Sequence, residues 1–349
     1  MPSRIISQYP RRSRCNDTVE NDDALSQTNR LGAIVVFLTD VCQPVYTQDL
    51  IMDSRFTLGW ISGQPASVPR KQERDRRFKR VTKKEWRYAT SALGSWVNKK
   101  SFERVESFCM FIGYPRSGHT LIGSLLDAHP NAVIADEMDA LKYIQAGFSR
   151  DQLFYLLLRG SRRAAKAGRQ RTGYSYHVAG QWQGRFDKLR VIGDKAGGAS
   201  AVRLAAFPFL LDILSNSFNT RLKFIHVTRN PYDVISTMAE WARSPLENSC
   251  GRFFDFAESI DQIKKEPKKA EIYDLKHEDF IASPKAVLKE LCRFLNLEEN
   301  DAYFEACASI VYQSPHKSRL KAPWNPALID AVKQKINRVP FLRDYSFDI

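Results

Sequence analysis

The chain has 349 residues, which is enough for one large domain with an extension or for two smaller domains. Its 43% hydrophobic and 26% charged residues are typical of a globular protein with a sizeable core. Lysine and arginine outnumber aspartate and glutamate by 53 to 39, and the resulting formal charge of +14 favours anionic ligands or surfaces. No run reaches the roughly 18 apolar residues that cross a bilayer, which excludes a membrane span within this sequence.

The first 105 residues are expected to form an N-terminal extension. Residues 1–30 are polar, charged and aperiodic, a pattern typical of disorder. Residues 70–87 hold ten basic residues, and the ordinary interpretation of such a run is a solvated charged segment. Because no nucleic-acid-binding motif accompanies the run, we expect no nucleic-acid partner. The sequence therefore predicts a partly disordered, basic extension over residues 1–105 and a single domain over residues 106–349.

The cysteines and the early apolar run indicate the cellular compartment in which the protein works. The six cysteines are dispersed and form no C-x-x-C pair, which suits a reducing environment. The most apolar early run, residues 31–38, is short and follows a polar segment, unlike an ordinary signal peptide. We therefore expect a soluble, cytoplasmic protein, with a lost membrane anchor and a Golgi location left open.

From residue 106 onward, apolar runs alternate with helical patterns. Buried strands are predicted at residues 107–114, 132–135, 189–195, 221–231 and 271–280. Helices are predicted at residues 120–129, 151–168, 232–242 and 283–297, the last with Ser283 as N-cap. This alternation predicts an α/β fold, a P-loop-like parallel sheet flanked by helices. Ligands of such sheets bind beyond the carboxyl ends of the strands, so the informative loops are 113–120, 194–198 and 228–233.

The first of these loops reads GYPRSGHT at residues 113–120. It keeps the glycines and the threonine of the P-loop template G-x-x-x-x-G-K-[ST], but His119 occupies the lysine position. Free N–H groups at the start of the following helix favour a phosphate. The main cation becomes Arg116, with His119 as a weaker and pH-dependent one. The loop thus indicates a short terminal phosphate without a metal-bound triphosphate; a glycine-rich turn without a ligand stays open.

The second motif reads RNPYDVIS at residues 229–236, directly after the predicted strand LKFIHVT. Arg229 falls at the carboxyl end of that strand, and Ser236 follows seven residues later in the next helix. An arginine with a nearby hydroxyl is a compact site for a second phosphate. The alternative is an ordinary strand-to-helix turn with a surface arginine.

Together, GYPRSGHTLIGSLLDAHP and FIHVTRNPYDVIS resemble the sulfotransferases that use 3′-phosphoadenosine 5′-phosphosulfate (PAPS), above all the tyrosylprotein and carbohydrate branches. The resemblance extends over roughly residues 106–345. It implies that the first motif binds the 5′-phosphosulfate, that the second binds the 3′-phosphate, and that no metal takes part. The cosubstrate-binding residues it implies are Arg116, Ser117, Gly118, His119, Thr120, Leu121, Arg229, Ser236, Lys317 and Arg319.

The resemblance also implies catalytic roles for Glu137, Lys195 and Arg116. Glu137, which follows a short predicted strand, is the implied general base, and Asp136 is its one-residue rival. Lys195 and Arg116 are expected to stabilise charge on the transferring sulfuryl group. The sequence departs from the family pattern where His277 replaces a tyrosine of the late Y-E-x-L stretch.

The expected activity is transfer of the sulfuryl group from PAPS to a hydroxyl or amine acceptor by in-line displacement. Residues 138–188 are rich in aromatic side chains and are expected to line the acceptor pocket. A small molecule, a glycan and a peptide all stay open as acceptors, and so does a homodimer. The alternatives are a P-loop kinase or NTPase-like nucleotide-binding protein and an inactive homologue.

Overall fold

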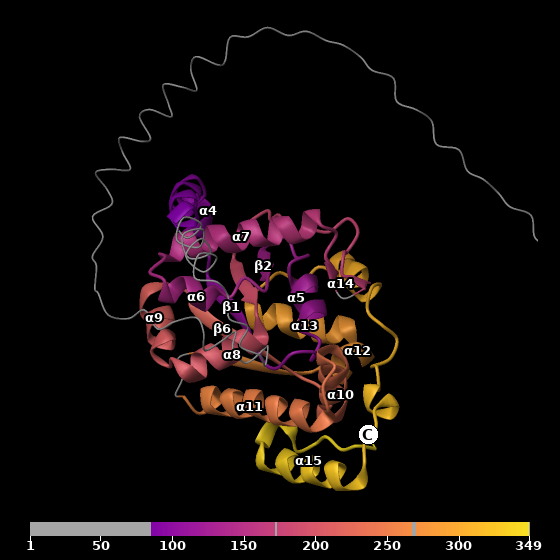
Figure 1. Ribbon diagram of the computed structural model, residues 1–349. Coiled ribbons are helices and arrows are strands. Elements are labelled where there is room, and N and C mark those ends of the chain that lie inside the picture. Colours follow the sequence, from indigo (N-terminus) through magenta and orange to yellow (C-terminus); the bar gives the residue numbers. More distant parts are fainter. Residues whose placement is uncertain (1–84, 172, 267–269, 349) are drawn as a thin grey trace, which may run out of the picture. The chain divides into compact units, whose positions relative to one another are not determined.

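The computed structural model describes residues 85–171, 173–266 and 270–348 (Figure 1). All of them belong to one compact unit of the chain, Arg70–Ile349. The predicted disordered start and most of the predicted basic run lie outside the described residues. The boundary expected after residue 105 stays a prediction.

A five-stranded parallel sheet forms the centre of this unit. Its strands are β1 (Ser107–Ile112), β2 (Ala132–Asp136), β5 (Val191–Lys195), β6 (Arg221–Thr228) and β7 (Glu271–Lys276). They lie in the order β2-β5-β1-β6-β7, so β1 is central. Because every neighbouring pair is parallel, all five carboxyl ends reach the same edge of the sheet. The predicted α/β fold with a parallel sheet is confirmed.

Helices cover both faces of the sheet, because side chains of a strand point alternately to opposite faces and those of the central strands are apolar in both directions. From β1, Phe108 and Met110 face one apolar cluster, whereas Cys109 and Phe111 face the other. The first cluster is completed by α6 (Ala140–Gln145), α7 (Arg150–Lys166), α8 (Gly197–Ala206), α9 (Phe209–Ser217), α10 (Pro231–Ala242), α11 (Leu246–Lys265) and α15 (Pro326–Arg338). The second is completed by α5 (His119–Leu126), α12 (His277–Ala282), α13 (Pro284–Leu295) and α14 (Asp301–Ala308). Figure 1 shows α11 and α15 side by side beyond one face.

Smaller elements join these layers. A hairpin of β3 (Gln170–Arg171) and β4 (Tyr174–Ser175) follows α7 and stands apart from the main sheet. Residues 85–97 are helical, and α4 (Lys99–Phe102) carries Phe102 into the larger cluster, edge-on to Phe154 of α7. Two 3₁₀ helices, η1 (Ser318–Lys321) and η2 (Pro340–Leu342), lie near the C-terminal end.

The predicted elements occur with shifted ends. All five predicted strands and all four predicted helices have counterparts, and α7 starts with a capping box in which Ser149 and Gln152 bond each other's backbone. The strand predicted to run to residue 280 was wrong at its end, since β7 stops at Lys276 and α12 begins at once. Ser283 does precede α13, but its side chain makes no capping hydrogen bond.

Within residues 85–171, 173–266 and 270–348, no single helix is long and apolar enough to cross a membrane. Among the helices that the structure describes, α8 and α9 taken together reach the required length and composition, and they are bent by 107° where they meet. Both contribute to the core of the domain, through Leu204 and Leu210 among others.

Candidate functional site

The loop between β1 and α5 adopts a conformation that few residue types accept. Gly118 has φ 99°, where a β-carbon would lie 2.4 Å from Nδ1 of His277. Arg116 also lies in the left-handed region, with φ 69°, an uncommon state for a side chain of this size. Helix α5 begins directly after Gly118, so its first N–H groups point back into the loop. The loop therefore has the backbone of an anion cradle.

His119, in the position of the P-loop lysine, is buried within the loop. Its Nε2 lies 3.2 Å from the carbonyl oxygen of Ile112, and its Nδ1 lies 3.0 Å from Oγ of Ser117. Burial is the main cause that lowers the pKa of His119 to about 3, and the charge of Lys195 adds to it. Without an anion in the loop the imidazole is therefore neutral at pH 7, and the predicted contact of His119 with a cosubstrate stays a prediction.

The remaining loop residues hold the loop together. The hydroxyl of Ser117 lies 3.0 Å from the carbonyl oxygen of Tyr114 as well as beside His119, so it is engaged inside the loop. Oγ1 of Thr120 accepts a hydrogen bond from Nζ of Lys195 at 3.1 Å. Leu121 packs in the smaller apolar cluster. The predicted contacts of these residues with a cosubstrate stay predictions.

Lys195 joins the loop to two carboxylates. It ends β5, beside β2, which delivers Asp136 and Glu137 to the same edge. Its Nζ lies 2.6 Å from Oδ1 of Asp136 and 3.0 Å from Oε1 of Glu137. Only 4% of the Lys195 side chain is exposed, and burial lowers its pKa while Asp136 opposes that shift. The carboxylates are thus paired with a cation, and no group of metal-binding side chains occurs among the described residues.

A tight turn fixes the position of Glu137. The residue has φ 52°, and its backbone N–H donates to the carbonyl of Lys195 at 3.1 Å. The buried carboxylate of Asp194 accepts from the N–H groups of Met138 at 3.0 Å and Ala140 at 2.8 Å. Burial raises the pKa of Asp194 to about 6. Sequence reasoning missed Asp194, although its position directly before Lys195 at a strand end was a usable signal.

Arg171, from the β3–β4 hairpin, reaches the same carboxylates from the solvent side. Its guanidinium pairs with Oε2 of Glu137 through Nη2, and its Nε lies 3.4 Å from Oδ2 of Asp136. The Arg171 side chain is 41% exposed and that of Glu137 is 51% exposed. Sequence reasoning missed Arg171 because a two-residue strand has no periodicity from which its direction could be read.

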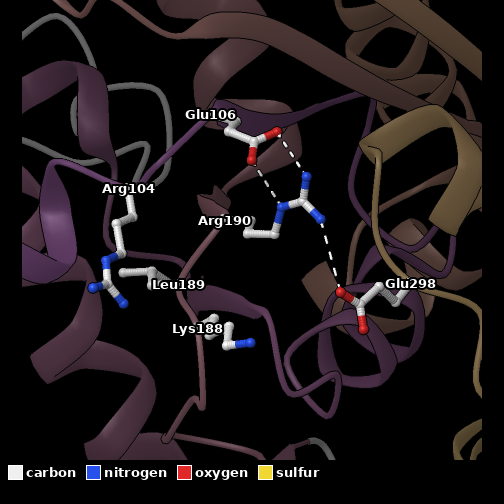
Figure 2. A pocket seen from close by; sticks show the side chains of 6 residues that line it. All are labelled: Arg104, Glu106, Lys188, Leu189, Arg190 and Glu298. Carbon is white, nitrogen blue, oxygen red and sulfur yellow. Dashed lines mark hydrogen bonds and ion pairs between the residues drawn. The ribbon is translucent and has the colours of Figure 1, made fainter.

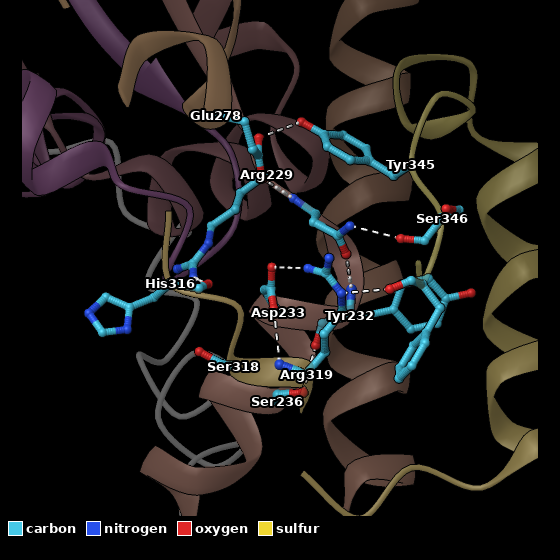
Figure 3. Close-up of polar contacts among 12 residues, drawn as sticks. Arg229, Tyr232, Asp233, Ser236, Glu278, His316, Ser318, Arg319, Tyr345 and Ser346 are labelled. Carbon is cyan, nitrogen blue, oxygen red and sulfur yellow. Dashed lines mark hydrogen bonds and ion pairs between the residues drawn. The ribbon is translucent and has the colours of Figure 1, made fainter. Parts of the chain in front are cut away.

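Arg229 lies at the end of β6 and touches the loop of the first motif. Its Nη1 donates to the carbonyl of Arg116 at 3.1 Å. Its Nη2 donates to the carbonyl of His316 at 2.6 Å (Figure 3). Its Nε is buried and has no hydrogen-bond partner among the described residues. The buried Nδ1 of His277, which packs against Gly118, likewise has none there. The fold thus brings the two sequence motifs together around polar atoms that a ligand can satisfy.

A late segment of the chain closes against α10 next to Arg229. Arg319 is buried, and its Nη1 and backbone N–H bind the carboxylate of Asp233 at 2.5 and 2.9 Å (Figure 3). The hydroxyl of Ser236 donates to Tyr232 and accepts from Nε1 of Trp324 at 2.9 Å. These contacts hold the segment in place, so the Arg319 guanidinium already has protein partners. The predicted phosphate contacts of Ser236 and Arg319 stay predictions.

Lys317 stands before η1 with an exposed side chain, and its predicted phosphate contact also stays a prediction. The Arg116 side chain lies over the ring of Trp241 from α10, with 5.3 Å between the guanidinium carbon and the ring centre. Arg116 is half-buried within the loop.

A separate cavity of about 350 Å³ lies at the opposite edge of the sheet (Figure 2). It is lined by Arg104, Glu106, Lys188, Leu189, Arg190 and Glu298. Glu106 and Arg190 directly precede β1 and β5, and they pair with each other at 2.8 Å. Because parallel sheets bind ligands at the carboxyl ends of their strands, this cavity is not the candidate site.

The comparison with protein families agrees with this geometry. The model of the sulfotransferase family matches residues 110–301, which include both motifs and all five strands except the start of β1. The chain belongs to the sulfotransferase family. Its general activity is therefore transfer of a sulfuryl group. A search of curated protein sequences found no match.

Several solved sulfotransferase structures are similar to this sulfotransferase. The sulfotransferase domain of the olefin synthase of Synechococcus PCC 7002 is 18% identical, with a TM-score of 0.40 over 65% of this chain and 83% of that one. Sulfotransferase STF9 of Mycobacterium avium is 12% identical, with a TM-score of 0.47 over 95% and 99%. Mouse sulfotransferase SULT7A1 complexed with PAP is 14% identical, with a TM-score of 0.32 over 64% and 69%.

Proposed function

We propose that this sulfotransferase uses PAPS as its sulfuryl donor and transfers the group to an acceptor hydroxyl or amine with Glu137 as general base. The observation that carries the proposal is the contact between the two motifs, in which Arg229 donates to the carbonyl of Arg116 at 3.1 Å. A donor with phosphates at two separated positions requires an anion cradle and a second cationic site that are held at a constant separation. The contact between these residues supplies that connection.

On the donor side, the N–H groups at the start of α5 and the Arg116 side chain would hold the 5′-phosphosulfate. The buried Nε of Arg229 would bind the 3′-phosphate, with Ser236 beside it once Trp324 releases the hydroxyl. The lysine that reaches the β and γ phosphates in a triphosphate-binding P-loop is replaced by His119, and the cation of this loop is Arg116, two residues before Gly118. This difference favours a sulfotransferase over the kinase or NTPase alternative.

On the acceptor side, Glu137 would take the proton of the acceptor while the acceptor oxygen or nitrogen forms a bond to sulfur. The bond between sulfur and the 5′-phosphate oxygen breaks in line, and that oxygen leaves with the bond electrons. Lys195, 3.0 Å from Glu137 and 3.1 Å from Thr120, lies where it can stabilise charge on the sulfuryl oxygens or on the leaving oxygen. The proton on Glu137 then passes to water.

The decisive experiment measures binding of the product nucleotide, adenosine 3′,5′-bisphosphate, by calorimetry, together with transfer from ³⁵S-labelled PAPS to a panel of hydroxyl and amine acceptors. Removing a charged hydrogen bond costs about 1.5–3 kcal/mol, so Arg229→Gln should weaken nucleotide binding about 10- to 100-fold. The matched control is Arg243→Gln, which removes an exposed arginine at the other end of α10.

Two results would contradict the proposal in different ways. Absence of nucleotide binding by the wild-type protein would exclude PAPS as the donor. If the wild-type protein binds the nucleotide but transfers the label to no acceptor, and Glu137→Gln behaves in the same way, the protein is an inactive homologue.

A further inference from the structure

The exposed apolar side chains of this domain gather on one helix. Of the ten large hydrophobic side chains that are exposed among the described residues, five belong to the helix of residues 85–97. The other five lie on five separate elements. Single apolar side chains are common at protein surfaces, whereas a group of them on one short helix indicates a surface that binds a partner.

This helix packs on α7 through its opposite side. Gly94 lies so close to the ring of Tyr155 from α7 that an added β-carbon would be 2.2 Å from the ring. Gln152 of α7 donates to the carbonyl of Tyr88 at 3.2 Å, and Ser91 beside it is buried. Successive residues of a helix turn by about 100°, so four side chains point away from α7. This apolar face, 53% to 74% exposed, consists of Trp86, Leu93, Trp96 and Val97.

The same side of α7 carries a row of cations. This basic stripe follows Tyr155 along the helix and consists of the exposed residues Arg159, Arg162, Arg163 and Lys166. Residues three or four positions apart share one side of a helix, so the stripe lies on the side of Tyr155. Because the helix of residues 85–97 crosses α7 at Tyr155, the apolar face and the basic stripe point in the same direction. Figure 1 shows α4, which follows that helix, beside α7.

The charge of the basic stripe is not compensated locally. Asp151 is the one acidic residue in the sequence of α7, and it pairs with Arg150 in the first turn. Within the described part of the chain, no cation of the stripe forms an ion pair. Over residues 85–104 four basic residues stand against two acidic ones, and in the sequence the basic run of residues 70–87 leads directly into this helix. The surface therefore combines an apolar face with an excess of positive charge.

An anionic membrane matches this combination. Tryptophan prefers the boundary between lipid headgroups and acyl chains. Helices with Trp and Leu on one face and Lys or Arg beside it lie in that boundary, and anionic lipids attract the basic residues. A nucleic acid offers the same charge but no apolar layer in which Leu93 and Val97 could be buried. The geometry and the charge thus favour a lipid surface.

We propose that the apolar face and the basic stripe dock the domain on an anionic membrane surface. Trp86 and Trp96 would lie at the level of the lipid headgroups, and the basic stripe would lie against the lipid phosphates and carboxylates. The inference goes beyond the proposed function and does not depend on the identity of the donor or the acceptor.

The test uses the full-length protein and vesicles of phosphatidylcholine alone or of equal parts phosphatidylcholine and phosphatidylserine. Partition coefficients are measured by cosedimentation. Each Lys or Arg at an anionic surface raises the partition coefficient about 5-fold, so removing three of them through Arg159→Gln, Arg162→Gln and Arg163→Gln together should lower it about 100-fold on the mixed vesicles. Trp86→Gln with Trp96→Gln should lower it at least about 10-fold, because less apolar surface is then buried. Brominated phosphatidylcholine should quench the tryptophan fluorescence of the wild-type protein more than that of this double variant.

Two control variants remove the same residue types elsewhere. Trp241→Gln removes an exposed tryptophan of α10. The combination of Lys333→Gln, Lys335→Gln and Arg338→Gln removes three exposed cations of α15, which Figure 1 shows far from α7. Both should keep the wild-type partition coefficient, and all variants should keep the wild-type melting temperature, since the substituted side chains are exposed.

Four results would overturn the proposal. They are no binding of the wild-type protein to the mixed vesicles, equal binding to both kinds of vesicle, and a loss in the α15 variant as large as in the basic-stripe variant. The fourth is a wild-type dimer that ignores vesicles and becomes a monomer in the double tryptophan variant, which would assign the apolar face to a second copy of the chain. Binding to the mixed vesicles that weakens with added salt and with each of the two docking variants supports it.

Discussion

Two of the carboxylate–arginine pairs in this domain differ sharply in burial, although both arginines come from the same short stretch of chain. Asp127 pairs with Arg169, and their side chains are 0% and 3% exposed. Glu137 pairs with Arg171, and their side chains are 51% and 41% exposed. Asp127 also accepts hydrogen bonds from Ser161 and from two backbone N–H groups, so all of its capacity is used inside the protein.

The two pairs use the same carboxylate–arginine chemistry, but their different burial gives them different roles. Burial raises the pKa of Asp127 and Arg169 opposes that shift, so the buried pair depends on both partners. It joins the end of α5 to the base of the hairpin. The exposed pair costs little to open and contains Glu137 of the candidate site. One pair builds the scaffold, and the other lies at the exposed side of the candidate site.

The largest expected effect comes from breaking the buried pair. Arg169→Met leaves the Asp127 carboxylate buried without its cation, which should cost about 3–5 kcal/mol of the free energy of unfolding. Denaturant titration at pH 7 measures the loss. The double variant Asp127→Asn with Arg169→Met should recover much of it, because no charge is then left unpaired. A loss below about 1 kcal/mol for the single variant would show that the pair is no more structural than the exposed one.

Changes in the exposed pair should affect activity, whereas changes in the buried pair affect stability. Glu137→Gln keeps the shape of the side chain but removes the base, so kcat should fall about 10²- to 10⁴-fold while the melting temperature stays close to that of the wild type. Steady-state kinetics with labelled PAPS measure the fall. Asp136→Asn is the control, and a larger loss in that variant would assign the base to Asp136.

Acid should destabilise the protein through its buried histidines. The pKa of His119 and of His277 is lowered to about 3, so both stay neutral in the folded protein while unfolded histidines bind protons below about pH 6.5. Stability therefore falls as the pH drops below 6.5, and the lowered pKa values of His129 and His226 act in the same direction. Asp194, whose pKa is raised to about 6, and Asp127, whose pKa is also raised by burial, oppose the trend because a raised pKa favours the protonated carboxyl in the folded state.

The four histidines with lowered pKa outnumber these two carboxyls, so the free energy of unfolding should fall between pH 6 and pH 5, by about 1.4 kcal/mol per pH unit for each proton that the unfolded state binds in excess. Urea titrations at both values check it. His277→Phe should reduce the slope by a similar amount. A flat profile would mean that these imidazoles are charged in the folded protein.

The smallest expected effect is the change in the free energy of unfolding when the exposed pair is removed. Arg171→Gln should change the free energy of unfolding by no more than about 1 kcal/mol, as for other exposed ion pairs. The same denaturant titration that detects the loss in Arg169→Met serves as the measurement. A loss comparable to that of Arg169→Met would remove the distinction between the two pairs.

Much of the fold follows from local patterns. The runs at residues 107–114 and 221–231 are apolar enough to be buried strands in any arrangement, and Pro231 stops the second one. The polar residues at their ends mark the edge where the site lies. The sequence analysis did not predict the β3–β4 hairpin, the turn to α12 after β7, or the helices α6, α8, α9, α11, α14 and α15.

By itself the sequence determined the parallel α/β architecture, the phosphate-type loop, the second motif at Arg229 and the resemblance to sulfotransferases. These features depend on neighbours in the chain, so their signals are local. Only the tertiary structure decided that burial keeps His119 neutral. It also decided that Arg169 is buried with Asp127, 42 residues away, whereas Arg171 forms an exposed pair with Glu137, 34 residues away. Charge state and burial depend on which distant segments of the chain pack against a side chain. The local patterns of the 349-residue sequence do not specify that packing.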